Sequence, residues 1–393
     1  MYIHEQTDWP KFHWNSEALT GLLAEVRHRQ GRLLGQMQTL GFGLQEEAVL
    51  RTLTEDVVKS SAIEGQELDP AAVRSSIARR LGMDVGGLKP ADRDVEGVVE
   101  MMLDATRNYD KPLTEERLFG WHASLFPTGR SGMRRITVGG WRNDSHGPMQ
   151  VISGPVGKER VHFEAPKVPR LEKEMTEFLE WFNGGPEVDL VLKAGIAHLW
   201  FVTIHPFDDG NGRIARAIAD LCLARSEKSS QRFYSMSAQI RQERKEYYDL
   251  LEHTQKGETD ITEWLTWFLE CLGRAIDGAE TLLASVLTKA RFWESVGASP
   301  LNDRQRLMLN KLLDGFDGKL TSSKWAKLTK SSQDTAQRDI TDLVQRGILV
   351  RSEEGGRSTS YTLAQVHTTR NARPPSDQRA SPGAPARSKP AAR

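Results

Sequence analysis

The 393-residue sequence predicts a mainly α-helical protein that ends in a small domain of three helices and a hairpin. Apolar residues recur at helical spacing over most of the first 290 positions, and strand patterns are confined to short stretches. Glycine or proline ends most of the helical runs. No run of about twenty apolar residues occurs, and the N-terminus lacks a basic and apolar leader. We therefore expect a cytoplasmic protein without membrane contact.

The charge balance and the cysteine content limit the kinds of function that the chain can have. The 53 basic residues are balanced by 53 acidic ones, so bulk charge does not direct the whole chain to nucleic acid. The cysteines, Cys222 and Cys271, both lie within apolar helical patterns. Buried thiols are therefore expected rather than a disulfide or a metal pair.

The length suggests two or three domains, and breaks in the helical pattern suggest where they meet. We expect an N-terminal helical domain over 1–90, a helical core over 91–290 and a winged-helix-like domain over 298–364. The remainder, 365–393, is rich in Pro, Ser, Ala and Arg and predicts a disordered tail.

Ten helices are predicted before the C-terminal domain, with a long decorated loop and a small hairpin between the fifth and the sixth. The predicted helices cover 16–41, 44–65, 68–81, 92–106, 114–125, 170–182, 188–204, 211–224, 239–255 and 261–287.

One stretch, "HPFDDGNGRIAR" over 205–216, has the composition of a site rather than of a core or surface helix. The apolar helix before it should end at His205, because a proline follows. A tight turn then leads to the N-terminus of a new helix that carries Arg213 and Arg216. Free backbone N–H groups and a partial positive charge make such a terminus suitable for phosphate.

The same stretch supplies chemistry beside the anion site. His205 offers a base that titrates near neutral pH. Asp209 would repel phosphate unless it holds a divalent cation, so it is a candidate Mg²⁺ ligand. Phe207 is expected to be a core anchor that fixes the loop. A base, a metal and an anion cradle are the parts needed for attack of a hydroxyl on phosphorus.

These twelve residues resemble the signature of Fic-domain proteins, His-x-Phe-x-Asp/Glu-Gly-Asn-Gly-Arg-x-x-Arg, at every fixed position. The resemblance implies a Fic helical core and transfer of AMP from ATP to a Ser, Thr or Tyr hydroxyl of a target protein, with release of pyrophosphate. By this resemblance His205 deprotonates the hydroxyl and Asp209 holds Mg²⁺. The residues that cradle or neutralise the phosphates are then Gly210, Asn211, Gly212, Arg213 and Arg216. A relative that phosphorylates its target carries a lysine in this loop, which is absent here.

Two further segments are matched to the family's nucleotide and target site. "ERVHFEAP" resembles the flap hairpin that aligns the target by strand addition. Its candidate residues are Val161, His162, Phe163 and Glu164. "RKEYYDLLE" resembles the segment that contacts adenine, which makes Tyr247 and Tyr248 candidates, although adjacent residues on a helix point in different directions.

"SSAIEG", over 60–65, places Ser60 and Glu64 one helical turn apart on one face. A glutamate near a helix C-terminus is unfavourable unless something compensates it. The pattern is similar to the family's inhibitory helix, in which Glu64 would pair with Arg216 and keep ATP in an unproductive pose. The flanking sequence resembles the helical N-terminal domain of one subgroup. Autoinhibition within the same chain is therefore expected.

The winged-helix-like domain gives no clear charge signal. Its expected recognition helix, 333–345, carries Arg338 among three aspartates. The expected wing turns at Gly355-Gly356 and mixes Arg351 and Arg357 with Glu353 and Glu354. Because phosphate contacts dominate DNA affinity, homodimerisation or target docking is favoured over DNA binding.

Two alternatives stay open beside an autoinhibited adenylyltransferase. The chain could be a DNA-binding regulator whose Fic core senses nucleotide. It could also remove AMP from a modified protein, with Glu64 positioning a water molecule and His205 acting as the acid.

Overall fold

The structure is a computed structural model that describes residues 1–83, 90–143, 147–155, 157–185, 188–297, 300–313, 315–316, 318–352 and 359–364. Two compact units are distinguished, Met1–Thr288 and Lys289–Arg393. The expected turn at Gly355-Gly356, the wing residues Glu353, Glu354 and Arg357, and the tail over 365–393 lie outside the described residues.

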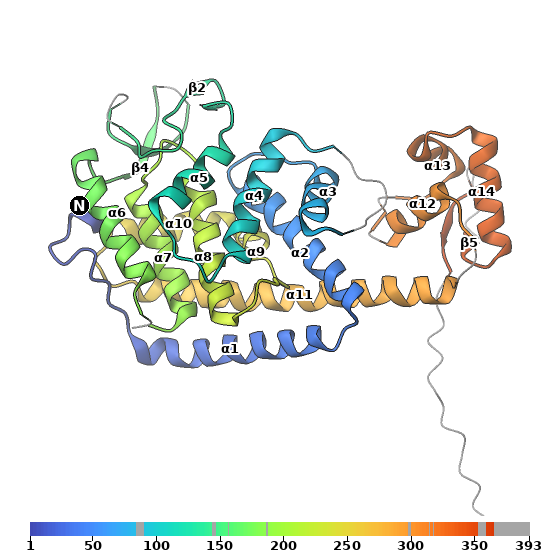
Figure 1. Cartoon of the computed structure of the whole chain (residues 1–393), viewed down its shortest axis with the longest axis horizontal. Helices are drawn as coiled ribbons and strands as arrows, with labels where there is room; N and C mark the ends of the chain where they lie inside the picture. Colours follow the sequence, from blue (N-terminus) through green and yellow to red (C-terminus); the bar gives the residue numbers. More distant parts are fainter. Residues whose placement is uncertain are drawn as a thin grey trace, which may run out of the picture. The chain divides into compact units, whose positions relative to one another are not determined.

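The first unit begins with helices that the sequence pattern predicts closely (Figure 1). A short 3₁₀ turn is followed by a long helix whose N-cap, Asn15, accepts a hydrogen bond from the backbone N–H of Ala18. Gly82 ends the third α-helix in the left-handed conformation. The elements are η1 (Ile3–Glu5), α1 (Ser16–Gln38), α2 (Phe42–Ile63) and α3 (Pro70–Leu81).

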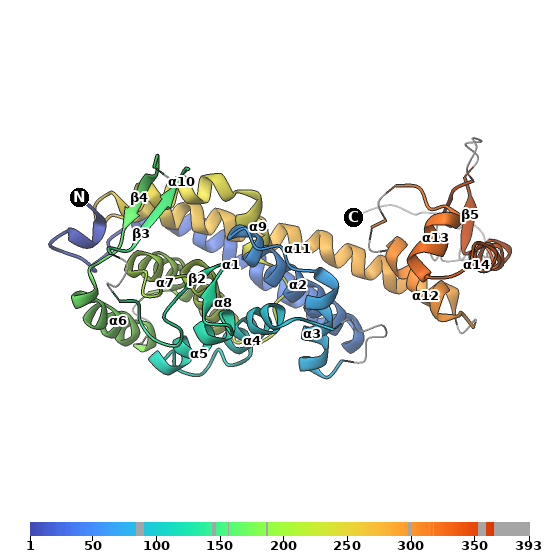
Figure 2. The same ribbon diagram turned by 90° about the horizontal axis from the view of Figure 1, so that it is seen from above.

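The rest of this unit surrounds one central helix, α7, in which every residue from Val191 to Ile204 is buried. α8 packs against α7, and α1 lies alongside α11, joined by the ion pairs of Arg29 with Asp277 and Arg32 with Glu280 (Figure 2). The elements are α4 (Arg93–Arg107), α5 (Glu115–Leu125), α6 (Val168–Asn183), α7 (Leu190–Ile204), α8 (Asn211–Glu227), α9 (Met236–Gln242), α10 (Arg244–Gln255) and α11 (Thr262–Val296).

A single hydrophobic core runs from Ile3 to Leu283. The segments expected as separate domains over 1–90 and 91–290 therefore share one core and one compact unit. Cys222 and Cys271 are buried free thiols within it, as predicted. No described helix has the length and apolarity needed to cross a membrane.

Two predicted helix boundaries are wrong. The single helix expected over 239–255 is two helices, because the backbone turns at Glu243 (φ −98°, ψ 23°) between α9 and α10. The Glu243 carboxylate is fixed there by Arg274 of α11, which donates to it at 2.6 and 2.8 Å. The helix expected to end at 287 continues to Val296.

The loop between α5 and α6 contains two antiparallel hairpins. The first pairs β1 (Arg130–Ser131) with β2 (Arg134–Arg135). The second pairs β3 (Gln150–Ser153) with β4 (Arg160–Glu164), with an irregularity between Val151 and Ile152. The second hairpin includes the expected flap.

The second unit has the expected three helices and strand pair. Trp325, Met308 and Ile340 are fully buried in its core. Leu349 pairs with Leu363 in the antiparallel ladder. The elements are α12 (Asp303–Leu313), α13 (Ser322–Thr329), α14 (Gln333–Gln345), β5 (Leu349–Arg351) and β6 (Tyr361–Leu363).

The crossing of α4 and α5 gives a direct test of the packing. A Cβ atom at buried Gly97 would overlap the Ser124 carbonyl, which belongs to the backbone and cannot rotate away. We expect Gly97→Ala to lower the free energy of unfolding by about 3 kcal/mol. Gly120 on α5 has nothing within 4 Å of its Cβ position, so Gly120→Ala is the matched control. It should keep or raise stability, by up to about 1 kcal/mol. Chemical denaturation of both variants measures the difference, and equal stabilities would contradict the crossing.

Candidate active site

The site begins where α7 ends at His205. This residue adopts the left-handed conformation (φ 53°, ψ 58°), which is uncommon for a residue other than glycine. The buried side chain of Arg142 stabilises the turn, since its Nε donates to the His205 carbonyl at 2.7 Å. The backbone N–H of Arg142 donates to the Pro206 carbonyl at 2.9 Å.

The loop after His205 closes on itself through Asn211. The backbone N–H of Phe207 donates to Asn211 Oδ1 at 3.0 Å, and Asn211 Nδ2 donates back to the Phe207 carbonyl at 2.9 Å. The Phe207 ring is fully buried and stacks on His122, with ring centroids 4.2 Å apart. The Asn211 side chain therefore braces the loop, which leaves only its backbone N–H for an anion.

The N-terminus of α8 is open toward the loop. Gly210 precedes it in the left-handed region (φ 83°), where a side chain would be strained and would meet the Phe126 ring. No side chain caps the first turn of α8. Backbone N–H groups of Asn211, Gly212 and Arg213 thus remain as donors at the positive end of the helix dipole.

Both arginines of the motif are buried within the first turns of α8. Arg213 lies over the Phe126 ring, and its Nη1 donates to Gln66 Oε1 at 3.1 Å. Arg216 Nε donates to Ser60 Oγ at 2.9 Å, and its Nη2 donates to the Ser60 carbonyl at the same distance. Within the described part of the chain, Arg213 Nε and Arg216 Nη1 have no hydrogen-bond partner. Two buried cationic donors therefore lack an acceptor.

Glu64 reaches this site from α2. It follows the last helical residue, and its Oε1 forms an ion pair with Arg216 Nη2 at 2.9 Å. Its carboxylate also fills the space in which a Cβ atom at Gly212 would lie, directly against the first turn of α8. Its side chain is 31% exposed, whereas that of Arg216 is 2% exposed. The structure thus places Ser60 and Glu64 together on Arg216, with Glu64 acting as an internal anion at the helix N-terminus.

The protonation state of His205 follows from its surroundings. Its Nδ1 lies 3.1 Å from the Val202 carbonyl, which can only accept, so Nδ1 carries the hydrogen and Nε2 has the lone pair. Burial, with a smaller contribution from the nearby Arg142, lowers the pKa of His205 to about 4, although the Val202 carbonyl and the charges of Asp209 and Glu64 oppose the shift. The expectation that His205 titrates near neutral pH was therefore wrong. The imidazole is neutral at pH 7.

The adjacent aspartates are fixed by the loop between α5 and α6. Asp208 accepts a hydrogen bond from the backbone N–H of Thr137 at 2.8 Å. Asp209 accepts from the Ser131 hydroxyl and from the backbone N–H of Gly210. Nowhere in the described ranges do three or more Cys, His, Asp or Glu side chains form a metal-binding group. A cation at Asp209 would take its other ligands from a bound phosphate and from water.

The four flap candidates do not converge on one place. Phe163 is buried against the rings of Tyr2 and His4, so it anchors the hairpin and is unavailable to a nucleotide. Val161 is exposed on β4. The sequence could not show this split, because it depends on the N-terminal segment, which packs on the hairpin.

The polar flap candidates bind other parts of the protein. His162 Nδ1 lies 2.5 Å from Glu252 on α10, and its Nε2 lies 2.6 Å from Ser153 Oγ. The Glu164 side chain accepts from Gln150 at 2.8 Å. These contacts join the hairpin to α10 and to itself.

The two tyrosines of α10 have different surroundings. Tyr247 is buried next to Arg216, and its hydroxyl lies 2.9 Å from His198 Nε2. Tyr248 is half-buried, with Arg244 over its ring at 5.4 Å. Of the two tyrosines, only Tyr248 therefore offers a partly accessible ring face for contact with a nucleobase. Gln255, the last residue of α10, is buried and donates to Thr203 Oγ1 at 3.2 Å.

Sequence reasoning missed the residues that support the motif from elsewhere in the chain. Arg142 and His122 hold the backbone and the Phe207 ring, and Ser131 holds Asp209. None of them lies in a recognisable pattern, since each acts through tertiary contacts. Gln66 follows "SSAIEG" directly, and its proximity to that motif was the one available signal.

The helical fold brings the N-terminus of α8 next to His205, whose ring is neutral at pH 7. Residues 112–223 match the model of the Fic/DOC family, and residues 2–83 match a domain of unknown function, DUF4172. Two segments of the chain are thus similar to known families, the segment over 112–223 to Fic/DOC proteins and the segment over 2–83 to DUF4172. A crystal structure of a Fic family protein from Desulfovibrio desulfuricans G20 has a similar fold, with a TM-score of 0.52 and 22% identity. The match covers 91% of this chain and 98% of the chain in that crystal structure.

Two curated relatives match a smaller part of the chain than this crystal structure does. The chain is 25% identical over 243 residues to the protein adenylyltransferase Fic of Nematostella vectensis. The matched region covers 59% of this chain and 50% of that protein. The chain is 24% identical over 255 residues to the protein of the same name from Culex quinquefasciatus, with 62% and 45% covered. The chain therefore spans about half the length of the curated relatives that it matches.

Three histidines with lowered pKa values make the stability of the first unit sensitive to acid. Burial lowers the pKa of His122 and His205 to about 4 and that of His198 to about 3, against 6.5 when unfolded. Between pH 6.5 and these lowered values the unfolded chain binds more protons, so stability falls as the pH falls. At pH 5 each of these histidines should lower the free energy of unfolding by about 2 kcal/mol relative to pH 7.

Denaturation at pH 7 and pH 5 measures this loss. His198→Gln should reduce the difference in stability between the two pH values by the contribution of one histidine, about 2 kcal/mol. The exposed His28 provides the control, and His28→Gln should leave the difference unchanged. An identical pH difference in wild type and His198→Gln would contradict a neutral buried His198.

Proposed function

We propose that the chain is an autoinhibited protein adenylyltransferase, which transfers AMP from ATP to a Ser, Thr or Tyr hydroxyl of a target protein and releases pyrophosphate. The observation that carries the proposal is the pair of buried arginines at the open N-terminus of α8, beside a histidine with an unprotonated Nε2. The similarity to proteins named protein adenylyltransferase supports the same reaction.

His205 acts as the general base. Its neutral ring accepts the hydroxyl proton at Nε2 while the Nδ1–H donates to the Val202 carbonyl, which keeps the ring oriented. The hydroxyl oxygen forms a bond to the α-phosphorus, and the bond from that phosphorus to the pyrophosphate oxygen breaks. A low pKa keeps the base deprotonated at pH 7, although it makes the base a weak one.

The anion cradle binds the phosphates. The first-turn N–H groups of α8 donate to a phosphate, and Gly210 and Gly212 leave room for its close approach. Arg213 and Arg216 neutralise the outer phosphates, and a phosphate oxygen would satisfy Arg213 Nε and Arg216 Nη1. Tyr248 supplies a partly accessible ring for contact with the adenine of ATP.

Mg²⁺ fits the carboxylate of Asp209. One carboxylate with substrate phosphates and water is a ligand set that Mg²⁺ commonly takes, and a hard cation would offset the repulsion between Asp209 and the phosphates. When bound, Mg²⁺ supplies charge neutralisation on the phosphates. The contacts of Asp209 with Ser131 and Gly210 orient its oxygens for this role.

Glu64 inhibits the reaction from α2. It pairs with the arginine that would neutralise the terminal phosphate, and it occupies the space against Gly212. ATP bound beside Glu64 would lack this arginine and would meet a carboxylate. Because Glu64 is partly exposed and ends its helix, its removal leaves the contacts of Ser60 with Arg216 in place.

The test is labelling with Mg²⁺ and ATP that carries the label at the α-phosphate. Wild type, Glu64→Gly and the double variant Glu64→Gly/His205→Ala are compared. We expect label on protein, including the chain itself, to rise at least about tenfold in Glu64→Gly. Without Glu64 the buried Arg216 is free to bind a phosphate of ATP. The double variant should lose the label, since a general base typically contributes about 100-fold or more.

A matched acidic variant controls for loss of charge alone. Glu67 is exposed and three residues from Glu64, so Glu67→Gly should label like wild type. Absence of label in every form, with α-labelled CTP, GTP and UTP also unreactive, would contradict nucleotidyl transfer. Release of AMP from a modified protein by wild type, lost in Glu64→Gly, would instead assign AMP removal to the site.

A further inference from the structure

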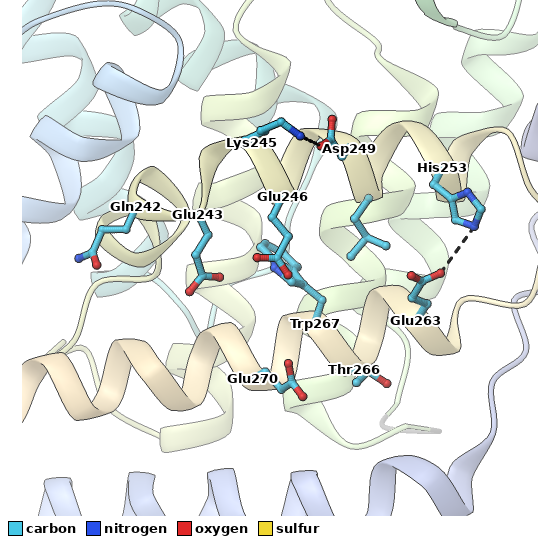
Figure 3. Close-up of a pocket in the computed structure, with 11 residues that line it drawn as sticks. Gln242, Glu243, Lys245, Glu246, Asp249, His253, Glu263, Thr266, Trp267 and Glu270 are labelled. Carbon is cyan, nitrogen blue, oxygen red and sulfur yellow. Dashed lines mark hydrogen bonds and ion pairs between the residues drawn. The ribbon is translucent and has the colours of Figure 1, made fainter.

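A groove of about 830 Å³ lies between α10 and α11, outside the set of residues assigned to the nucleotide (Figure 3). One wall is formed by the α10 side chains that include Glu246, Asp249 and Leu250, and the other by the α11 side chains that include Thr266 and Glu270. Both walls belong to the first compact unit. The groove therefore lies wholly within that unit.

The groove is strongly acidic. Its lining contains Glu243, Glu246, Asp249, Glu263 and Glu270, against Lys245 and His253. Lys245 pairs with Asp249, and His253 pairs with Glu263. Arg274 pairs with Glu243 and, at 3.7 Å, with Glu270. Among the described residues Glu246 makes no hydrogen bond or ion pair and is exposed. The lining thus keeps an excess of negative charge after its internal pairs are made.

A second, independent observation lies at the floor. Trp267 lines the groove with only 4% of its surface exposed, and its indole N–H has no hydrogen-bond partner in the described part of the chain. Figure 3 shows the Trp267 indole projecting from α11 toward α10, beside Glu246. A buried donor without an acceptor is costly, so it points to a ligand that brings one.

We propose that this groove docks a Lys/Arg-bearing segment of the protein substrate in extended conformation; the assignment to the substrate rests on the proposed adenylyltransferase function. The segment's cationic side chains pair with Glu246 and Glu270, and one of its backbone carbonyls accepts the Trp267 N–H. Nucleotides and nucleic acids carry the wrong charge for this lining. A peptide supplies both the cations and the carbonyl acceptor that the groove lacks.

The position of the groove suits a docking role. α10 directs Tyr247 toward Arg216, while Glu246 and Asp249 on the same helix face the groove. The Trp267 and Tyr247 ring centroids are 5.6 Å apart. A helix with its side chains is about 10 Å across, so a few extended residues would join a docked segment to the hydroxyl that reacts. Docking would raise the effective concentration of that hydroxyl.

Binding is measured without nucleotide, using the full chain and a short fluorescein-labelled peptide of alternating lysine and alanine. Anisotropy at low ionic strength should show saturable binding, which weakens at physiological ionic strength and is absent for the same peptide with acetylated lysines. Glu246→Lys should weaken binding at least about tenfold by charge reversal. Trp267→Phe keeps the ring and removes the N–H, and it should weaken binding about fivefold.

Glu172 provides the matched control, since it is equally exposed but lies on α6 away from the groove. Glu172→Lys should change the affinity by less than about twofold, because Glu172 does not line the groove and salt weakens the effect of exposed charges that are not in contact. In nitrogen-15 spectra the indole N–H signal that disappears in Trp267→Phe should move when the peptide is added. Thermal melts check that each variant is folded.

Absence of saturable binding to wild type would overturn the proposal. Equal weakening by Glu246→Lys and Glu172→Lys would also overturn it, since attraction would then be non-specific. These outcomes are independent of the labelling experiment. Labelling that succeeds with no peptide binding refutes the groove alone, and peptide binding without any labelling leaves an acidic docking groove on a protein that lacks the proposed activity.

Discussion

The buried guanidinium of Arg216 is the charge on which the arrangement of the site depends. An unpaired charge at that depth would cost several kcal/mol, so an acceptor must face it in every state. In the structure α2 supplies the acceptors through the Ser60 hydroxyl and carbonyl and through Glu64. Only Glu64 brings negative charge. A phosphate is the natural replacement for Glu64, because it offers the same charge-assisted hydrogen bonds.

The rest of the loop is held by contacts that do not involve Glu64. Arg142 holds the His205 carbonyl, Asn211 closes the turn, and Phe207 stacks on His122. His205 and the first turn of α8 are thus in place while Glu64 is present. In the proposed inhibition Glu64 takes the place of a phosphate at Arg216, which needs no rearrangement of the loop.

The sequence predicted what local patterns encode. The helix pattern predicted α14 with its observed ends, and the twelve-residue motif indicated the order of histidine, turn and helix N-terminus. The pattern of Ser60 and Glu64, by family resemblance, indicated an ion pair with Arg216, which is 152 positions from Glu64 in the chain.

What the sequence did not predict depends on tertiary contacts. The break between α9 and α10 lies where Glu243 meets Arg274 of α11, and Phe163 turns inward because the N-terminal segment packs on the flap. The lowered pKa of His205 follows from burial, which a motif does not show. The role of Arg142 was equally hidden, since its partners are backbone carbonyls far along the chain.

The most direct test of the central claim compares the affinities of ATP and AMP for wild type and Glu64→Gly by calorimetry with Mg²⁺. If Glu64 competes with the outer phosphates for Arg216, the variant should bind ATP at least about tenfold more tightly, while its affinity for AMP changes by less than about twofold. An equal gain for both nucleotides, or no gain for ATP, would contradict the claim that Glu64 occupies the place of a phosphate at Arg216.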